Sequence, residues 1–374
     1  MKKKLLPALI VTGLIILVVI IMGITALINK YTPTKKTEDL KEYFNISSDD
    51  EAALIVDNEL SDYKAKIIDK KIYVDYKFVH DSLNSRFYWD ANENVLLYTT
   101  ASDIISAAAD SNSYSVTKQT NDFGYPIVKA TSDSALIALD YVKQYSNITF
   151  KSYDDPARIV ITSKWDEIDS ATVSKSTQVR VKGGIKSPIL KEVKKDDKIT
   201  ILDSGDKWDK VATEDGIIGY IKRKALSESK KTKLTNPDYE EETFTHIKKD
   251  KDICLAWNQV TSQSANSKVP QVISSTKGIN VMSPTWFYLN DNNGNLADIA
   301  SKDYVNYCHS QGIEVWGLFS NLENTDVDAA YVLTHTSTRT TLINQIMSAA
   351  FNYELDGVNI DFENITEAAY GDSY

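Results

Sequence analysis

The chain has 374 residues, 42% of them hydrophobic and 25% charged, which is typical of folded globular protein and too long for one ordinary hydrophobic core. The formal net charge of −10 argues against a nucleic-acid partner, because the sequence has no basic stripe to neutralise phosphates. Two cysteines are too few for a disulfide framework, so Cys254 and Cys308 are expected to be small buried hydrophobic residues.

The first segment predicts a membrane anchor. Three lysines precede an uncharged apolar run from Leu5 to Ile28, long enough to cross a hydrocarbon layer of roughly 30 Å as a helix. A cleaved signal peptide would have a shorter apolar core and a small-x-small cleavage site, and neither is evident. We therefore expect residues 1–28 to form a cytoplasmic tip and an uncleaved transmembrane helix, and residues 29–43 to form a polar linker. Lysines flank both ends of the run, so their charge does not by itself orient this single-pass span. The modules that follow suit an extracytoplasmic surface, so we expect a cell-membrane protein with the bulk of its chain outside the cytoplasm.

Residues 44–163 contain one pattern twice. KIYVDYKFVHDSL and then RFYWDANENVLLYTT predict a strand, a helix and a hairpin, and YPIVKATSDSALIALDYVKQYS and then ITFKSYDDPARIVITS predict the same series. This small α+β repeat resembles the N-terminal-domain-like module named after copper amine oxidases, which implies a stalk or spacer, with a binding role as the alternative. The segment has a lone histidine, His80, on a predicted helix, so we expect no metal here.

Residues 168–227 change to short strands with glycine and aspartate turns. Their order is an arginine-bearing strand, a Gly-Gly loop, the strand KITIL, a strand that begins at Trp208, and a closing Gly-Tyr-Ile strand. This order resembles the bacterial Src-homology-3-like module, a small β-barrel, and the resemblance implies binding to the cell wall or to a peptide. Trp208 and Tyr220 either fill the barrel core or contribute to such binding. Residues 228–252 are then predicted to be a mixed-charge linker.

The last segment, residues 253–374, alternates strands and helices. Strands are predicted at ICLAWNQV, GINVMSPTWFYL, IEVWGLFSN and DGVNIDFEN, with a helix at KDYVNYCHSQ and another at TRTTLINQIMSAAFNYEL, which Ser337 or Thr338 caps. Alternation of this kind predicts parallel strands with crossover helices, and apolar strands indicate burial on both faces.

The last of these strands has a polar side. Side chains alternate along a strand, so Val358, Ile360 and Phe362 share a face that is expected to lie under helices, while Asn359, Asp361 and Glu363 share the other. Two carboxylates under helices would be costly to desolvate, whereas in a closed (β/α)₈ barrel this face points to the lumen and the strand ends at the mouth. We therefore expect a TIM barrel, with Glu363 nearest solvent.

DGVNIDFE is similar to the Asp-x-x-Asp-x-Asp-x-Glu signature of family-18 glycoside hydrolases, and its flanks are similar to the spore and cell-wall lytic branch. Asp356, Asp361 and Glu363 match, and Asn359 replaces the second aspartate. The resemblance implies that Glu363 protonates the glycosidic oxygen while the substrate's acetamide attacks the anomeric carbon, and that Asp361 orients the acetamide. Asn359 puts a proton relay in doubt, and Asp356 is more plausibly structural, satisfying backbone donors.

Three tryptophans on or beside the first three strands are either platforms for sugars or barrel packing: Trp257, Trp286 and Trp316. No cofactor or metal is expected. The leading hypothesis is a membrane-anchored glycosidase that cuts an N-acetylhexosamine polymer, with peptidoglycan preferred over chitin. The alternative is a non-catalytic envelope-binding protein with a degenerate barrel.

A complete barrel of this kind needs roughly 250 residues, and residues 253–374 supply about half of that number. We therefore expect this chain to be a fragment of a longer gene product, inactive by itself.

Overall fold

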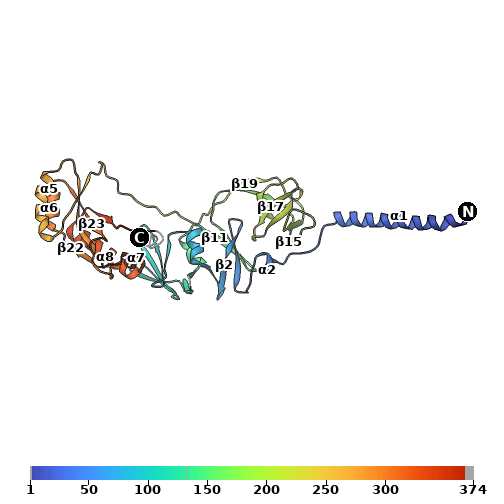
Figure 1. Cartoon of the computed structure of the whole chain (residues 1–374), viewed down its shortest axis with the longest axis horizontal. Coiled ribbons are helices and arrows are strands. Elements are labelled where there is room, and N and C mark those ends of the chain that lie inside the picture. Colours follow the sequence, from blue (N-terminus) through green and yellow to red (C-terminus); the bar gives the residue numbers. More distant parts are fainter. Residues whose placement is uncertain (1, 133, 367–374) are drawn as a thin grey trace. The chain divides into compact units, whose positions relative to one another are not determined.

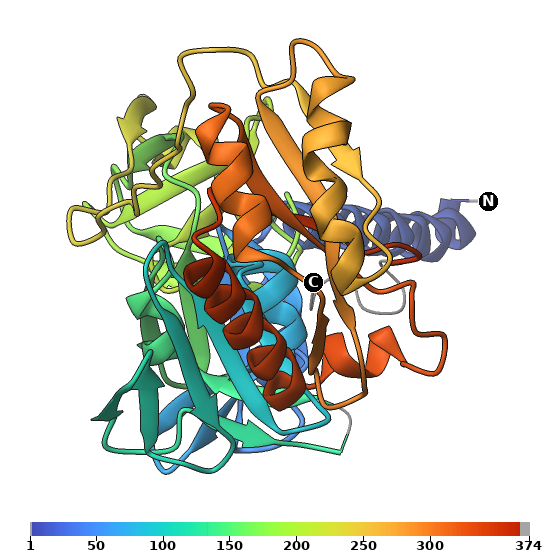
Figure 2. The same cartoon turned by 90° about the vertical axis from the view of Figure 1, so that its left-hand side faces the viewer.

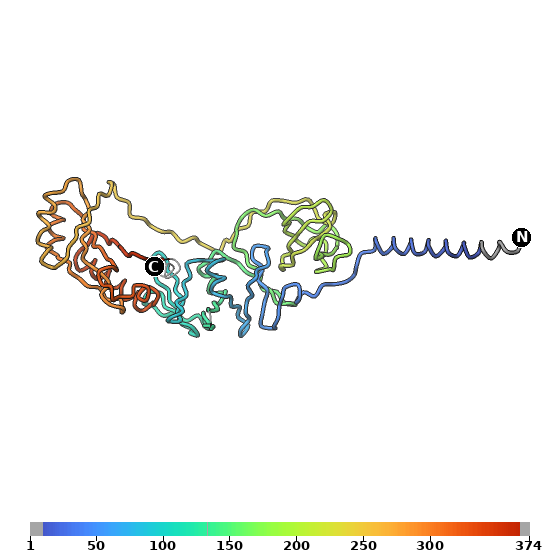
Figure 3. Tube along the Cα trace, viewed as in Figure 1, coloured from blue at the N-terminus to red at the C-terminus, as the bar shows by residue number. Residues whose placement is uncertain are grey.

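The computed structural model describes residues 2–132 and 134–366 (Figures 1 and 3). They form two compact units, one from Met1–Phe78 with Ile137–Glu241 and the other from Val79–Leu136 with Glu242–Tyr374. Each unit contains strands from two segments that are far apart in the sequence.

The chain begins with the long helix α1 (Lys2–Tyr31). Its segment Ile10–Tyr31 has a mean hydropathy of 2.9 and is long enough to cross a membrane, and its length and composition fit a membrane span or a signal sequence. The residues that follow are more ordered than a linker. The N–H groups of Thr34 and Glu38 donate to the carbonyls of Ile185 and Ile189, both at 2.8 Å, before the short helix α2 (Leu40–Tyr43).

The first sheet has seven strands in the order β11-β12-β1-β2-β3-β10-β9. Its strands are β1 (Glu51–Val56), β2 (Glu59–Ile68), β3 (Lys71–Asp75), β9 (Val128–Ala130), β10 (Ala135–Ala138), β11 (Thr149–Tyr153) and β12 (Arg158–Thr162). Helical segments follow two of them, namely α3 (Tyr76–Phe78) with a π-helical turn (Val79–Leu83), and α4 (Leu139–Gln144).

The second sheet is antiparallel throughout, with the order β15-β14-β18-β17-β16-β13-β19. Its strands are β13 (Glu167–Thr172), β14 (Thr177–Arg180), β15 (Ile189–Val193), β16 (Lys198–Asp203), β17 (Trp208–Thr213), β18 (Ile218–Lys222) and β19 (Lys230–Lys233), with a 3₁₀ turn at Arg223–Ala225. Strands are therefore present at every position expected between residues 168 and 227, and β13 and β19 extend the sheet.

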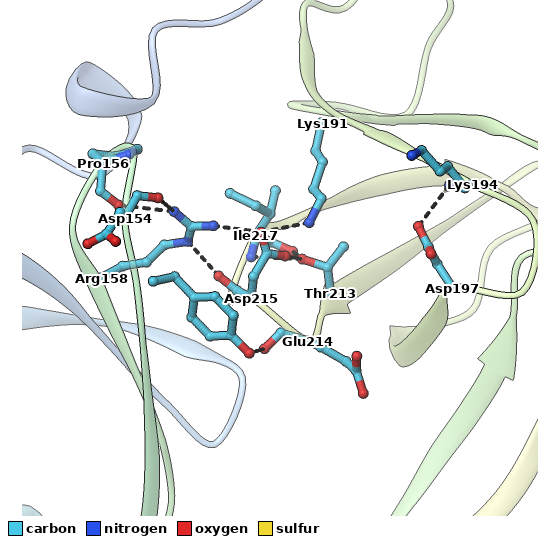
Figure 4. A network of polar contacts seen from close by, with 11 residues as sticks. Asp154, Pro156, Arg158, Lys191, Lys194, Asp197, Thr213, Glu214, Asp215 and Ile217 are labelled. Atoms are coloured by element: carbon cyan, nitrogen blue, oxygen red, sulfur yellow. Dashed lines mark hydrogen bonds and ion pairs between the residues drawn. The ribbon is translucent and has the colours of Figure 1, made fainter.

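A buried polar network joins these two sheets within the first unit (Figure 4). Arg158 of β12 donates from Nη2 to Asp215 Oδ2 at 2.6 Å and from Nε to the Asp215 carbonyl at 2.5 Å. Lys191 Nζ lies 2.6 Å from the same Oδ2 atom, and Thr213 donates to Oδ1 at 2.5 Å. Apolar side chains of both sheets, including Ile55 of β1 and Val211 of β17, share one core beside it.

The third sheet is a meander in the order β4-β5-β6-β7-β8, formed by β4 (Phe87–Asp90), β5 (Val95–Thr99), β6 (Ile104–Ala108), β7 (Ser113–Val116) and β8 (Gln119–Asp122). The hairpins of the two sequence copies in residues 44–163 therefore belong to different sheets. The hairpin β4–β5 of the first copy belongs to this sheet, whereas the hairpin β11–β12 of the second belongs to the first sheet.

The fourth sheet contains four parallel strands in the order β20-β21-β23-β24. They are β20 (Leu255–Asn258), β21 (Val281–Leu289), β23 (Glu314–Ser320) and β24 (Gly357–Asp361), and β22 (Leu296–Asp298) pairs with β21. The crossovers contain a 3₁₀ turn (Gln263–Lys268), α5 (Val269–Ser274), α6 (Lys302–Ser310), α7 (Ala329–Thr334) and α8 (Thr336–Tyr353). The four strands and the two long helices agree with the sequence expectation.

Helices α5, α6 and α8, yellow-orange to red in Figure 2, pack on one face of this sheet. Buried side chains of α6, among them Cys308, meet Met282, Val315 and Phe319 of the strands. The expectation that both cysteines are buried is wrong for Cys254, which is exposed because it precedes β20 at the edge of the sheet.

The helix α8 begins in a different way from the prediction. Ser337 and Thr338 lie inside the helix, and the N-cap is His335, whose side chain makes no capping bond. The free N–H groups of the first turn instead meet the turn between β4 and β5. Asp90 accepts from the N–H of Thr336 at 2.7 Å, and Glu93 accepts from the N–H of Ser337 at 2.9 Å. A carboxylate suits the positive end of the helix, so a distant turn supplies the cap.

Candidate active site

The pairing register shows which side chains of the parallel sheet share the face that the helices leave open. Partners in parallel strands point to the same side, and Trp257 pairs with Ser283, Trp316 with Gly357, Leu318 with Asn359, and Ser320 with Asp361. Met282, Val315 and Phe319 have the opposite parity and pack against the helices. One face therefore carries the side chains of Trp257, Ser283, Trp316, Asn359 and Asp361.

Asn359 is held by a hydrogen bond across this face. Its Nδ2 donates to Ser283 Oγ at 3.1 Å, and Ser283 is fully buried. Asp361, two residues further along β24, is exposed at the end of the strand. The polar set thus runs from a hydrogen-bonded amide at mid-strand to an exposed carboxylate at the carboxyl end.

Glu363 lies beyond the end of β24, where a neighbouring loop fixes its backbone. Asn321, which directly follows β23, accepts from the Glu363 N–H at 2.8 Å and donates to the Glu363 carbonyl at 3.0 Å. This reciprocal pair holds residue 363 at the carboxyl end of the sheet, and the Glu363 side chain is exposed. Sequence reasoning missed Asn321 and Ser283, although each is a polar residue in or directly after an apolar strand.

Asp356 directly precedes β24, at the opposite end of the strand from Asp361. Its Oδ2 accepts from the N–H of Val315 at 2.8 Å and lies 2.8 Å from Nε2 of His309 on α6. The carboxylate therefore ties the start of β24 to β23 and to α6, away from Asp361 and Glu363, as expected for a residue that satisfies backbone donors.

The three tryptophans divide between the two faces. Trp257 is 70% exposed on the open face, and Trp316 is half-buried beside Gly357, with its Nε1 donating to Glu314 at 3.1 Å. Trp286 is fully buried on the helix side, where it donates to Asn266 at 2.7 Å and meets the Tyr304 ring edge-on. Its interpretation as a sugar platform is wrong, because its parity directs the indole into the core.

The apolar face of β24 also differs from expectation. Val358 and Ile360 are 40% and 39% exposed, although they were expected to lie under helices, whereas Phe362 packs with Leu289 and Leu342. The reason is the position of β24 as the last strand in the order of this sheet, with a strand partner on one side only among the described residues.

Several titratable groups near the sheet have shifted pKa values, among them Glu314 and Cys308. A hydrogen bond from Lys249, followed by one from Trp316, lowers the pKa of Glu314 below its ordinary range. Burial, with a smaller contribution from the negative charge of Asp356, raises the pKa of the Cys308 thiol to about 12. Among the residues that the structure describes, no cluster of three or more histidine, cysteine or acidic side chains could hold a metal ion.

No protein-family model matches the chain, and no curated protein matches it. Part of the chain is similar to chitinases and a spore cortex-lytic enzyme of known structure. The chitinase of Chromobacterium violaceum is 16% identical over 30% of this chain and 35% of its own, with a TM-score of 0.24. The Bacillus cereus spore cortex-lytic enzyme SleL is 15% identical over 36% of this chain and 33% of its own, with a TM-score of 0.27. The chain spans about a third of the length of the solved structures that it matches first.

Proposed function

We propose that this chain carries the acid/base end of a glycoside hydrolase site that acts on N-acetylhexosamine polymers. The observation that supports this most is the register of β24, which puts Asn359 and Asp361 on the face that also carries Trp257 and Trp316. The second support is the Asn321 pair that holds Glu363 beyond Asp361. Acidic side chains at the carboxyl end of parallel strands beside an exposed indole suit a sugar chain lying across the sheet.

In the proposed mechanism the substrate supplies its own nucleophile. Glu363 protonates the glycosidic oxygen, and the acetamide oxygen of the substrate attacks the anomeric carbon as the leaving group departs. Asp361 accepts a hydrogen bond from the acetamide nitrogen and stabilises the cationic intermediate. Water that is deprotonated by Glu363 then opens this intermediate with retention of configuration. Asn359 cannot exchange a proton with Asp361 and is assigned a positioning role.

The substrate and location are part of the same proposal. The apolar helix α1 is proposed to anchor the chain in the cell membrane, with residues 44–163 as a stalk and residues 168–227 as a wall-facing module outside the cytoplasm. Those expectations favour peptidoglycan of the producing cell over chitin.

The test is release of reducing sugar from purified peptidoglycan by the product of the complete gene. Glu363→Gln is expected to reduce the rate by about 10²–10⁴-fold, the usual contribution of general acid–base catalysis. The matched control is Glu354→Gln, which removes an exposed carboxylate that pairs with Lys302 at the surface at 2.9 Å and is expected to retain activity. Equal release by the wild type and Glu363→Gln would contradict the proposal.

A second candidate is a carbohydrate-binding protein without catalysis. The hydrogen bond from Asn359 to Ser283 favours it, because a neutral polar face can be held together without any reaction. Saturable binding to peptidoglycan without cleavage, unchanged in Glu363→Gln, would support this function.

A further inference from the structure

A hollow of about 450 Å³ lies on the second sheet, at the junction of β17 and β18, far in sequence from the proposed active site. Trp208 is partly exposed in it, so this indole does more than fill a core. The lining residues are Ile185, Asp206, Lys207, Trp208, Lys222, Arg223 and Lys224.

The hollow is built on a fixed backbone. The buried Asp209 carboxylate accepts from the Gly205 N–H at 3.0 Å and lies 3.8 Å from Nε of Arg223. Arg223 Nη1 in turn donates to the Gly205 carbonyl at 3.1 Å. Behind the indole, a Cβ atom on Gly183 would lie 3.2 Å from Trp208 Cβ, so the loop lies directly against Trp208. The walls of the hollow therefore keep their shape without a ligand.

Its charge is opposite to that of the chain as a whole. Four of its lining side chains are cationic and one is acidic, in a chain with a net charge of −10. Lys222 Nζ lies 5.7 Å from the centre of the Trp208 ring, whereas in residues 2–132 and 134–366 no carboxylate pairs with Lys207, Lys222 or Lys224. Unpaired cations around a partly exposed indole and an isoleucine suit a ligand that is anionic at one end and apolar at the other.

The hollow adjoins the end of the apolar helix. Lys186, next to the lining residue Ile185, donates from Nζ to the carbonyl of Asn29 and, at 2.7 Å, to that of Thr32. Asn29 directly follows Ile28, the last residue of the uncharged apolar run. If α1 crosses a bilayer, this loop lies where the hydrocarbon ends and a headgroup layer about 5–8 Å deep begins.

We propose that the hollow around Trp208 binds the phosphate headgroup of anionic phospholipids in the membrane that α1 enters. Lys222 and Lys224 contact the phosphate, and Trp208 and Ile185 lie at the level of the glycerol and the first acyl carbons, where amphipathic rings are favoured. This inference rests on the membrane anchoring proposed above and is independent of the hydrolase activity. Its consequence is that the second sheet is held on the bilayer surface.

The experiment measures lipid binding to the full chain in neutral detergent, with native mass spectrometry counting bound lipid during titration. The probes are phosphatidylglycerol and the zwitterionic phosphatidylcholine with the same acyl chains. Each basic residue near a membrane surface contributes about fivefold to binding of anionic lipid. The double variant Lys222→Gln/Lys224→Gln is therefore expected to bind phosphatidylglycerol about 25-fold more weakly and phosphatidylcholine unchanged.

The matched control is Lys230→Gln/Lys233→Gln, which makes the same change of charge on exposed residues of β19 in the same sheet. It is expected to bind like the wild type. Equal affinity of the wild type for the two lipids would overturn the proposal, and so would an equal loss of phosphatidylglycerol affinity in both double variants. Displacement of phosphatidylglycerol by a soluble wall muropeptide would also overturn it. Flotation with phosphatidylcholine vesicles tests the anchor separately, since a chain that floats but does not prefer phosphatidylglycerol has the anchor and lacks the site.

Discussion

Replacing Asp215 by Asn is expected to destabilise the first unit by about 3 kcal/mol, because it leaves a buried cation without its counter-charge. The side chains of Arg158 and Asp215 are 6% and 14% exposed, and their ion pair measures 2.6 Å. Breaking a buried pair costs roughly 3–5 kcal/mol. The lower end applies here because Arg158 keeps its bonds to the carbonyls of Asp154 and Pro156 at 2.8 and 3.0 Å. A loss of 3 kcal/mol changes the ratio of folded to unfolded molecules about 140-fold.

The assay is hydrogen exchange of the full chain in increasing urea, read from peptides of β12 and β17. The control is Asp169→Asn, which breaks an ion pair of 3.0 Å with Lys231 in the same unit. The side chains of Asp169 and Lys231 are 41% and 64% exposed, and exposed pairs of this kind contribute at most about 1 kcal/mol to stability. Similar losses in the two variants, or a loss below about 0.5 kcal/mol for Asp215→Asn, would refute the reasoning.

The same pair predicts a dependence on pH. Burial is the largest single effect and raises the pKa of Asp215. Hydrogen bonds from Lys191 and Thr213, together with the charges of Lys191 and Arg158, lower the pKa by more in total, so it lies below the ordinary value of 3.8. A lowered pKa stabilises the folded state above the unfolded pKa, and this contribution is lost as the pH falls through the folded pKa. The difference between wild type and Asp215→Asn is therefore expected to be constant from about pH 7 to pH 5 and to shrink below pH 3.8. A difference that grows on acidification would contradict this sign.

Three further predictions concern the second unit. Asp90→Ala is expected to lower the free energy of unfolding by about 1–2 kcal/mol, because Asp90 caps α8. An unchanged urea midpoint would contradict that role. In the same assay Trp286→Ala is expected to lower the free energy of unfolding by about 3–5 kcal/mol, because this indole is fully buried. Trp257→Ala is expected to lower it by less than about 0.5 kcal/mol, because this indole is 70% exposed. Comparable losses in the two variants would overturn the assignment of faces. At pH 8 a thiol reagent is expected to label the exposed Cys254 in the folded chain and to label Cys308 only after denaturation. The reason is that Cys308 is buried and its pKa is raised to about 12, so it stays an unreactive thiol. Rapid labelling of both cysteines would be inconsistent with the packing of α6.

The positions of the parallel strands and the polar side of β24 could be predicted from the sequence because both depend on short-range patterns. Alternation within VNID already separates Val358 from Asn359, and the structure keeps that separation. The side to which Trp286 points could not be predicted in this way, because in VMSPTWFYL the polar residues Ser283 and Thr285 alternate only up to the tryptophan, and large apolar residues follow it. Only the register with β20 and β23, which includes an irregularity between Thr285 and Phe287, decides it.

Contacts between distant segments explain the other differences. Ser337 and Thr338 are good capping residues by local propensity, yet Asp90, 246 residues away from Thr336, supplies the cap. Residues 34–38 are polar and read as a linker, yet their backbone pairs with the segment Ile185–Ile189. Neither partner can be identified from the composition of the segment itself, because a backbone N–H group is satisfied equally well by any acceptor that the fold brings near it.

The neutral side chain at position 359 determines where charge can be placed on the open face. A carboxylate there could accept from the Ser283 hydroxyl but would place a charge in a partly buried position, whereas the Asn359 amide donates to Ser283 and leaves no charge to desolvate. Two carboxylates on this side, Asp361 at the carboxyl end of β24 and Glu363 beyond it, are exposed, whereas Glu314 at the start of β23 is bound by Trp316 and Lys249. The amide therefore binds within the middle of the strand without a charge, and the exposed acidic positions of this segment lie at and beyond its carboxyl end.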